Sequence, residues 1–219
     1  MLFNRLLVSL FTALLMFTSL AYAEKSPADV YIEAMELYNK KEYAKAVPLL
    51  QKAADKGHTK AQRELATIYR LGLAGTTDLK KAVKLYLQSA ADGDMISQFT
   101  LGAMYANGVG VMKNGAEAFT WYRKSADQGY SAAQLNLGLL YFQEKEYVKA
   151  LDWFVKAAEQ GNDGAQFVIG EMYRLGSGVD KNLQEARRWY TIAATKGNAP
   201  AKTRLEELDK LENPMNIAK

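Results

Sequence analysis

Few residues in this sequence of 219 could do chemistry. His58 is its only histidine and it has no cysteine, so the paired nitrogen and sulfur ligands of ordinary zinc sites are missing. A serine-histidine-aspartate triad would depend on His58 alone. No serine is followed by a lysine three residues later, as the penicillin-recognising serine enzymes require. We therefore expect no catalytic residue, no metal site and no cofactor.

Two glycine-rich stretches resemble phosphate-binding loops, namely "GVG" at 108–110 and "GSG" at 176–178. Neither follows a strand pattern and neither is followed by Gly-Lys, which the phosphate loop of nucleotide-binding proteins needs. Asp180 and Asn182 could begin a cation-binding loop, but no further acidic residues complete a coordination sphere. Both residues are better explained as helix caps, so these stretches are interpreted as connecting loops.

The sequence is organised as a series of repeats. A glycine closes an alanine-rich segment five times, in steps of 36, 36, 32 and 36 residues, at Gly57, Gly93, Gly129, Gly161 and Gly197. Within each segment a large apolar pair, such as Trp121 and Tyr122, follows an alanine by three and four residues. Such positions share one helical face. The period indicates a repeat array.

A second helical pattern begins after each of the first four closing glycines, as in "AQLNLGLLY" at 133–141. Gly102, Gly138 and Gly170 recur in it at one phase. A glycine inside a helix costs about 1 kcal/mol relative to alanine, so we expect a neighbouring helix to approach too closely there for a larger side chain. The closing glycines are expected to adopt the left-handed conformation that follows a helix end.

The two patterns together predict helical hairpins whose internal linkers have two lengths. Long linkers such as "NGVGVMKNG" and "LGSGVDKNL" carry Asp or Asn near the start of the next helix, where a cap is needed. Short linkers read "NKKEY" and "QEKEY". The short linker in the fourth hairpin lacks four residues, which explains the single step of 32.

These motifs carry a resemblance. The pattern A-Q-x-x-L-G-x-x-Y, G-x-G-V and A-x-x-W-Y-x-x-A-A-x-x-G resembles the Sel-1-like repeat (SLR) family, a relative of the tetratricopeptide repeat, across residues 28–208. Ala66 replaces the helix glycine, while Leu49 and Leu85 replace the tryptophan. The resemblance implies an all-α fold, a right-handed α-solenoid of about five helical hairpins with a C-terminal capping helix over 201–212. We expect this domain to occupy residues 24–213, before a disordered tail at 214–219.

The first 23 residues do not belong to the repeat. Arg5 precedes an apolar run from Leu6 to Leu20, and "AYA" at 21–23 offers the small residues that a signal peptidase requires. We expect cleavage between Ala23 and Glu24, and a periplasmic or secreted protein without stable membrane insertion. A retained anchor is the alternative, but the run of 15 residues is shorter than the roughly 20 that span a bilayer.

Charge points to no particular partner class. Without Arg5, the remaining 196 residues would carry 27 basic and 24 acidic side chains, a formal charge of +3. The basic residues are scattered among acidic ones, as on an ordinary solvated helix surface. Nucleic acid is therefore not expected as a partner.

The resemblance also implies a binding surface, because the first helix of each hairpin lines the concave face in tetratricopeptide-like arrays. Mapping the spacing of that surface predicts the partner-binding residues Tyr31, Tyr38, Arg63, Arg70, Phe99, Leu139, Phe142, Phe167 and Arg174. The middle of this set is apolar and arginines flank it, as in interaction hot spots. The alternative is that some of these residues, Phe167 and the neighbouring Leu135 especially, are buried between adjacent hairpins.

What the family implies is protein–protein interaction, so we expect a non-enzymatic periplasmic adaptor or regulator with a protein partner. One alternative is an immunity protein that inhibits a secreted toxin. Another is a β-lactam-binding hydrolase, but the absence of cysteine departs from the disulfide-rich members described in that role. Fold alone does not choose among these functions.

Overall fold

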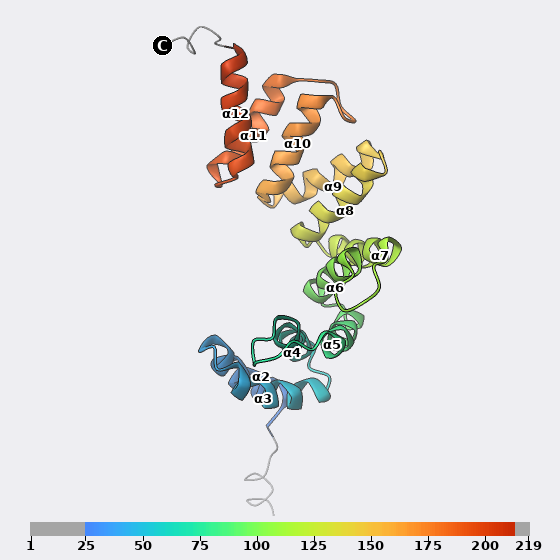
Figure 1. Ribbon diagram of the computed structural model, residues 1–219, viewed down its shortest axis with the longest axis vertical. Coiled ribbons are helices and arrows are strands. Elements are labelled where there is room, and N and C mark those ends of the chain that lie inside the picture. The colour runs from blue at the N-terminus through green and yellow to red at the C-terminus, as the bar shows by residue number, and fades with distance from the viewer. Residues whose placement is uncertain (1–24, 213–219) are drawn as a thin grey trace, which may run out of the picture. The chain divides into compact units, whose positions relative to one another are not determined.

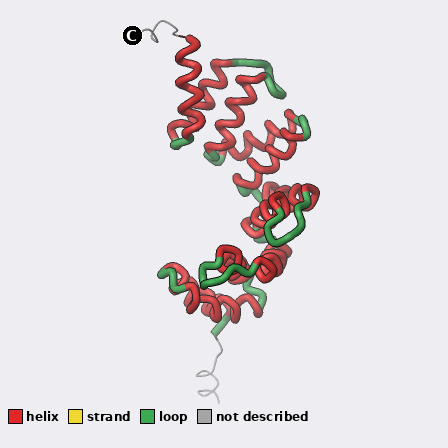
Figure 2. The backbone as a smooth tube through the Cα atoms, viewed as in Figure 1, coloured by secondary structure: helices red, strands yellow, loops and turns green. Residues whose placement is uncertain are grey.

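The structure is a computed structural model that describes residues 25–212. All regular secondary structure in this range is helical, which confirms the predicted all-α repeat fold (Figures 1 and 2). None of the helices in this range is long and apolar enough to cross a membrane. The predicted signal peptide at 1–23, its cleavage site and the predicted tail at 214–219 lie outside the described residues.

The described helices form two compact units, divided between Thr77 and Asp78. The first unit contains α2 (Pro27–Asn39), α3 (Tyr43–Asp55) and α4 (Thr59–Leu71). The second unit contains α5 (Leu79–Ala91), α6 (Met95–Asn107), α7 (Gly115–Asp127), α8 (Ser131–Gln143), α9 (Tyr147–Glu159), α10 (Asp163–Leu175), α11 (Leu183–Thr195) and α12 (Ala199–Glu212). The division falls in the linker of the second predicted hairpin.

Within the units the helices pack as the repeat predicts (Figure 1). We call the first helix of each hairpin helix A (α2, α4, α6, α8 and α10) and the second helix B (α3, α5, α7, α9 and α11). In the second unit α6 packs on α7, α8 on α9 and α10 on α11, and each helix B also contacts the next helix A. The last helix, α12, packs on α11 as a capping helix.

The helices that follow long linkers have side-chain caps at their starts, as the sequence predicts, but Asp180 is not one of them, because the N-cap of α11 is Asn182. Asp78, Asn114 and Asn182 each accept a hydrogen bond from a backbone N–H in the first turn of the following helix B. The glycines that close each helix B have φ angles between 80° and 94°, a conformation that strains any residue with a Cβ atom. The side-chain caps mark the starts of α5, α7 and α11, whereas α3 and α9, which follow short linkers, begin without one.

Each hairpin of the second unit is closed by an aromatic ring that lies over a glycine. A Cβ added at Gly138 would lie 2.5 Å from Cε1 of Phe154, and additions at Gly102 and Gly170 would lie 2.6 Å from atoms of Tyr122 and Tyr190. The predicted close approach of a neighbouring helix is therefore confirmed, and the neighbour is helix B of the same hairpin.

The first hairpin shows the same register with different residues. Ala34 and Leu50 occupy the positions of the glycine and the ring, and both are fully buried. In this hairpin an alanine on helix A is thus paired with a leucine instead of a ring, within a close-packed interior. The second hairpin carries Ala66 and Tyr86 at the same two positions, so an alanine on helix A does not always accompany a smaller residue on helix B.

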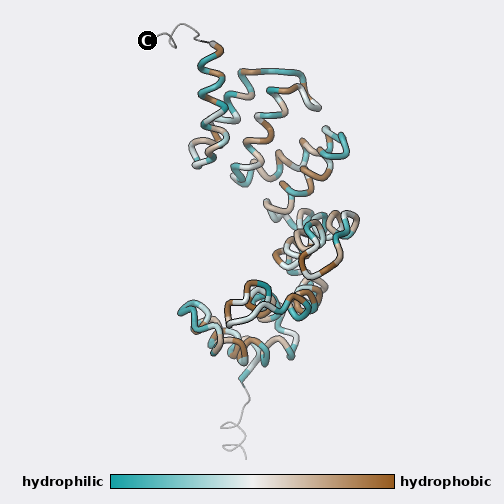
Figure 3. Tube along the Cα trace, viewed as in Figure 1, coloured by the Kyte–Doolittle hydropathy of each residue, from teal (hydrophilic) through white to brown (hydrophobic). Residues whose placement is uncertain are grey.

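Buried glutamines join each helix B to the next helix A. The side-chain amide of each glutamine donates to a backbone carbonyl eight residues earlier, at 3.0 to 3.4 Å, in the pairs Gln62–Ala54, Gln98–Ala90, Gln134–Ala126 and Gln166–Ala158. These bonds satisfy carbonyls at the ends of the B helices. Apolar residues recur along the same helices (Figure 3). Gln98 and Gln134 also accept hydrogen bonds from the side-chain amides of Gln128 and Gln160, at 2.7 and 2.8 Å.

We predict that Gly138→Ala destabilises the protein by about 1–2 kcal/mol, because overpacking against Phe154 outweighs the gain in helix propensity. The control is Gly115→Ala, since nothing lies within 4 Å of a Cβ at that helical position. Urea unfolding followed by circular dichroism measures both. An unchanged or raised stability of Gly138→Ala would show that the contact is not tight.

Candidate functional site

The predicted partner-binding residues occupy the fifth, ninth and twelfth positions of the A helices. Five of them belong to the second unit, namely Phe99, Leu139, Phe142, Phe167 and Arg174. They lie on α6, α8 and α10. Neither α6 nor α8 has a charged residue among its 13 residues, although both helices are partly exposed. Two successive A helices therefore present a neutral surface.

Side chains at the fifth position are half-buried between successive hairpins. The ring of Phe99 lies 5.2 Å from that of Tyr130, which precedes α8, and 5.7 Å from that of Tyr122. The ring of Phe167 lies 5.8 Å from that of Tyr190. Leu135 contacts the start of α10, where its Cδ2 lies 3.1 Å from the Cβ position of Gly164. These side chains contribute mainly to packing.

The ninth and twelfth positions of the A helices carry different residues, with different exposure, on α6 and α8. Leu139 is 37% exposed and lies on α8. Phe142 is half-buried, and its ring meets that of Tyr147 edge to face at 5.0 Å, across the short linker of its own hairpin. Ala103 and Ala106 on α6 pack against the core of the next layer. Leu139 is thus the most exposed apolar side chain among the predicted positions of this unit.

On α10 the same positions hold an ion-pair network. The Glu171 carboxylate accepts hydrogen bonds from Nη2 of Arg174 at 2.6 Å, from the Tyr190 hydroxyl at 2.5 Å and from Nε of Arg204 at 2.8 Å. Burial favours the protonated acid, but these three donors outweigh it and hold the pKa of Glu171 below its ordinary value of 4.5. Because Arg204 lies on α12, the network attaches the capping helix to the last hairpin.

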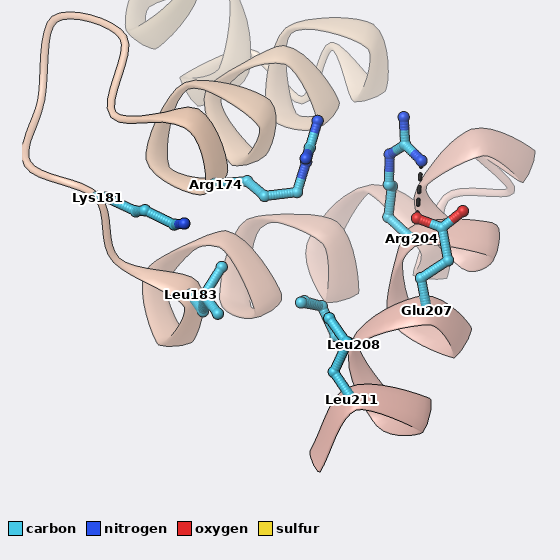
Figure 4. A pocket seen from close by; sticks show the side chains of 7 residues that line it. All are labelled: Arg174, Lys181, Leu183, Arg204, Glu207, Leu208 and Leu211. Atoms are coloured by element: carbon cyan, nitrogen blue, oxygen red, sulfur yellow. Dashed lines mark hydrogen bonds and ion pairs between the residues drawn. The ribbon is translucent and has the colours of Figure 1, made fainter. Parts of the chain in front are cut away.

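A pocket of about 190 Å³ lies beside this network (Figure 4). Its lining includes three basic side chains, Arg174, Lys181 and Arg204, together with Glu207 and the leucines at 183, 208 and 211. Arg204 also donates to Glu207 at 2.7 Å. Sequence reasoning missed this cluster, since Arg204 belongs to the capping helix and no repeat position marks it.

The remaining four predicted residues belong to the first unit. Tyr31 stacks on His58 with ring centroids 4.5 Å apart, and Tyr38 meets Tyr43 edge to face at 5.1 Å. Arg63 pairs with Glu64 at 2.8 Å, with both side chains 16% exposed. Arg70 is half-buried near the end of α4. In this unit the two tyrosines and Arg63 thus already contact other side chains of the unit.

His58 has a structural role in the first unit. Its Nδ1 accepts a hydrogen bond from the backbone N–H of Ala61 at 3.1 Å and so caps α4. The sequence favours a surface residue at this position, but the side chain is half-buried and forms a cap. Among the described residues, no group of three or more histidine, aspartate or glutamate side chains could hold a metal ion.

Comparison with protein families gives one match. The model described as the Sel1 repeat matches residues 39–58, 59–94, 96–130, 131–162 and 164–198. From the second match onward, each stretch contains a helix A and the helix B that follows it. Comparison with curated protein sequences gives no match.

Solved structures include several similar proteins. The Sel1 repeat protein from Oxalobacter formigenes is 28% identical with a TM-score of 0.76, over 84% of this chain and 79% of that one. A protective antigen of uropathogenic Escherichia coli strains, which displays an SLR fold, is 39% identical with a TM-score of 0.74, over 78% of this chain. This chain spans 37% of the antigen's length. An immunity protein from Pseudomonas aeruginosa is 28% identical with a TM-score of 0.53, over 83% of this chain and 71% of that one.

The cap made by His58 predicts a pH dependence. Burial lowers the pKa of His58 below its ordinary value of 6.5, so the neutral ring contributes stability that is present above pH 6.5 and is lost as the pH falls through the lowered value. Protonation of Nδ1 also removes the acceptor for Ala61. His58→Asn keeps a capping side chain that does not titrate.

We therefore predict that the wild type loses more thermal stability than His58→Asn when the pH is lowered from about 7.5 to about 5. Carboxylates titrate equally in both proteins, so the difference between them isolates the histidine. Equal losses in the two proteins would contradict a capping role for neutral His58.

Proposed function

The chain belongs to the Sel1 repeat family, and we therefore propose that it is a non-enzymatic adaptor or regulator that binds a protein partner through its A helices. The apolar anchor of this surface is Leu139 on α8. The proposal places the protein in the periplasm or outside the cell, and the signal-like sequence of residues 1–23 supports this location.

One observation carries the proposal. Two successive A helices, α6 and α8, have no charged side chain, yet their ninth and twelfth positions are not fully buried, and Leu139 is 37% exposed. Solvated helix faces normally carry charge. A neutral face with an open leucine is what a partner covers when it binds.

The chemistry of the partner follows from the neighbouring charges. Beside the neutral face, α10, the linker that follows it and α12 place Arg174, Lys181 and Arg204 near Glu171 and Glu207. These five groups leave an excess of one positive charge. A protein segment with an apolar side chain for Leu139 and an acidic residue toward α10 fits this arrangement.

An immunity protein is the second candidate. Two proteins described as immunity proteins from Pseudomonas aeruginosa are each 28% identical to this chain, with TM-scores of 0.53. In that case the partner is a toxin whose activity the chain inhibits. The captured partner distinguishes the two candidates, because a toxin would lose its activity in the complex and the partner of an adaptor would not.

We predict that Leu139→Glu weakens binding of the partner captured from the native envelope by about tenfold or more, since it places a charge at a buried apolar anchor. Leu139 is preferred to Phe142 for this test because Phe142 also packs on Tyr147. Dissociation constants from calorimetry or surface plasmon resonance measure the effect.

Val148→Glu is the matched control. Val148 is 66% exposed and lies on α9, the helix B of the same hairpin. We expect the control to bind like the wild type, and circular dichroism to show the same helicity in all three proteins. If Leu139→Glu binds as tightly as Val148→Glu, the A-helix surface is not the binding site.

A further inference from the structure

The long linkers in the second unit cover the preceding helix B. In the third hairpin, the Cβ position of Gly110 lies 2.9 Å from Cβ of Leu79 and 3.3 Å from Cγ2 of Val83, both on α5. In the fifth hairpin, the Cβ position of Gly178 lies 2.6 Å from Cβ of Tyr147 on α9. The G-x-G-V motif thus places its second glycine against the first turn of the helix B before it.

The fourth hairpin lacks this cover. Only Glu144, Lys145 and Glu146 join α8 to α9, whereas seven residues join α10 to α11. By the repeat, Gly115 and Phe119 on α7 correspond to Leu79 and Val83 on α5. Nothing lies within 4 Å of a Cβ at Gly115. The place that a glycine turn fills in the neighbouring hairpins is open here.

An open pocket of about 500 Å³ occupies this place. It is lined by Gly115, Phe119, Leu140, Tyr141, Gln143, Glu144, Glu146 and Lys149. Its aromatic floor is formed by the rings of Phe119 and Tyr141, which meet edge to face at 5.5 Å. The pocket therefore offers an aromatic floor next to a polar rim.

Among the residues that line the pocket, two carboxylates and one ammonium group are charged. Lys149 pairs with Glu146 at 3.2 Å, while the carboxylate of Glu144 makes no ion pair with any residue that the structure describes. The pair and the unpaired carboxylate leave one negative charge beside the aromatic floor. A basic side chain of a bound segment would complement it.

We propose that this pocket binds a glycine-containing turn of a partner protein, with a small apolar residue on Phe119 and Tyr141 and a lysine or arginine paired with Glu144. The linkers of the third and fifth hairpins supply the pattern for the occupant. Gly110 and Gly178 have φ angles of 73° and 75°, Val179 packs against the core beside α9, and each linker contains a lysine, Lys113 or Lys181.

This site is separate from the A-helix surface of the proposed function. Leu139 does not line the pocket, although Leu140, Tyr141 and Gln143 of the same helix do. Gly115 and Phe119 lie on α7, a helix B. Loss of binding at one site therefore does not imply loss at the other. Leu139→Glu tests the proposed function through partner binding, and Glu144→Gln tests this inference through peptide binding. Either one can fail while the other succeeds.

The test uses the full chain, expressed with its native N-terminal segment and labelled with ¹⁵N. The probe is a cyclised peptide with the sequence of residues 174–182, RLGSGVDKN, which holds the glycine turn and a lysine. We expect NMR shifts that concentrate on the backbone amides of the pocket residues. Glu144→Gln should weaken peptide binding by about threefold, as for an exposed ion pair.

One variant closes the pocket. It replaces Glu144–Glu146 with residues 176–182, which restores a covering linker within the chain. Gly115→Ala is the control, because nothing lies within 4 Å of a Cβ at this position. We expect the closing variant to abolish the peptide-induced shifts, while Gly115→Ala retains them.

Three results would overturn the proposal. The first is a wild type without shifts at these residues. The second is a restored-linker variant whose shifts match those of the wild type. The third is concentration-dependent self-association that the restored linker abolishes, because it would identify a second copy of the chain as the occupant.

Discussion

The contact on which this fold depends is that of an aromatic ring with a helical glycine. In three hairpins of the second unit, the ring on helix B lies so close to helix A that a single methyl group would clash. Close contact of this kind fixes the separation and the register of the two helices, because interiors tolerate neither voids nor overlaps. In the fifth hairpin the corresponding ring, that of Tyr190, also takes part in a hydrogen bond. Tyr190 lies over Gly170 and donates its hydroxyl to Glu171, so the hairpin contact also holds the network that attaches α12.

Once the hairpins are fixed, the surfaces depend on what each hairpin leaves uncovered. The buried glutamines bind each layer to the next through carbonyls at the ends of the B helices. Positions nine and twelve of the A helices differ from one layer to the next, and on α6 they hold Ala103 and Ala106, which pack against the core. On α8 these positions are apolar, and on α10 they are charged and already paired. The length of the linker between helix A and helix B has a separate effect, on the exposure of the preceding helix B. A linker with four fewer residues leaves the first turn of α7 open, where longer linkers close the corresponding turns of α5 and α9.

Much of this architecture could be predicted from the sequence, because each local pattern of residues recurs in several repeats. The phase of Gly102, Gly138 and Gly170 indicated the close helix contact, and the asparagine and aspartate residues indicated the caps. The contacts of particular side chains were not predictable in this way. Arg204 reaches Glu171 across 33 residues, and Phe142 packs on Tyr147 only because its linker is short. The shorter linker itself was evident in the step of 32 residues, but its consequence for Gly115 required knowledge of where the longer linkers lie.

The central claim is that the ring and the glycine are energetically coupled, and a double-mutant cycle between positions 138 and 154 tests it most directly. The cycle compares the unfolding free energies of Gly138→Ala, Phe154→Leu and the double variant, which reproduces the alanine and leucine of the first hairpin. The account predicts that the double variant loses less unfolding free energy than the two single variants lose together, by about 1 kcal/mol or more. Additive losses, within about 0.3 kcal/mol, would contradict it.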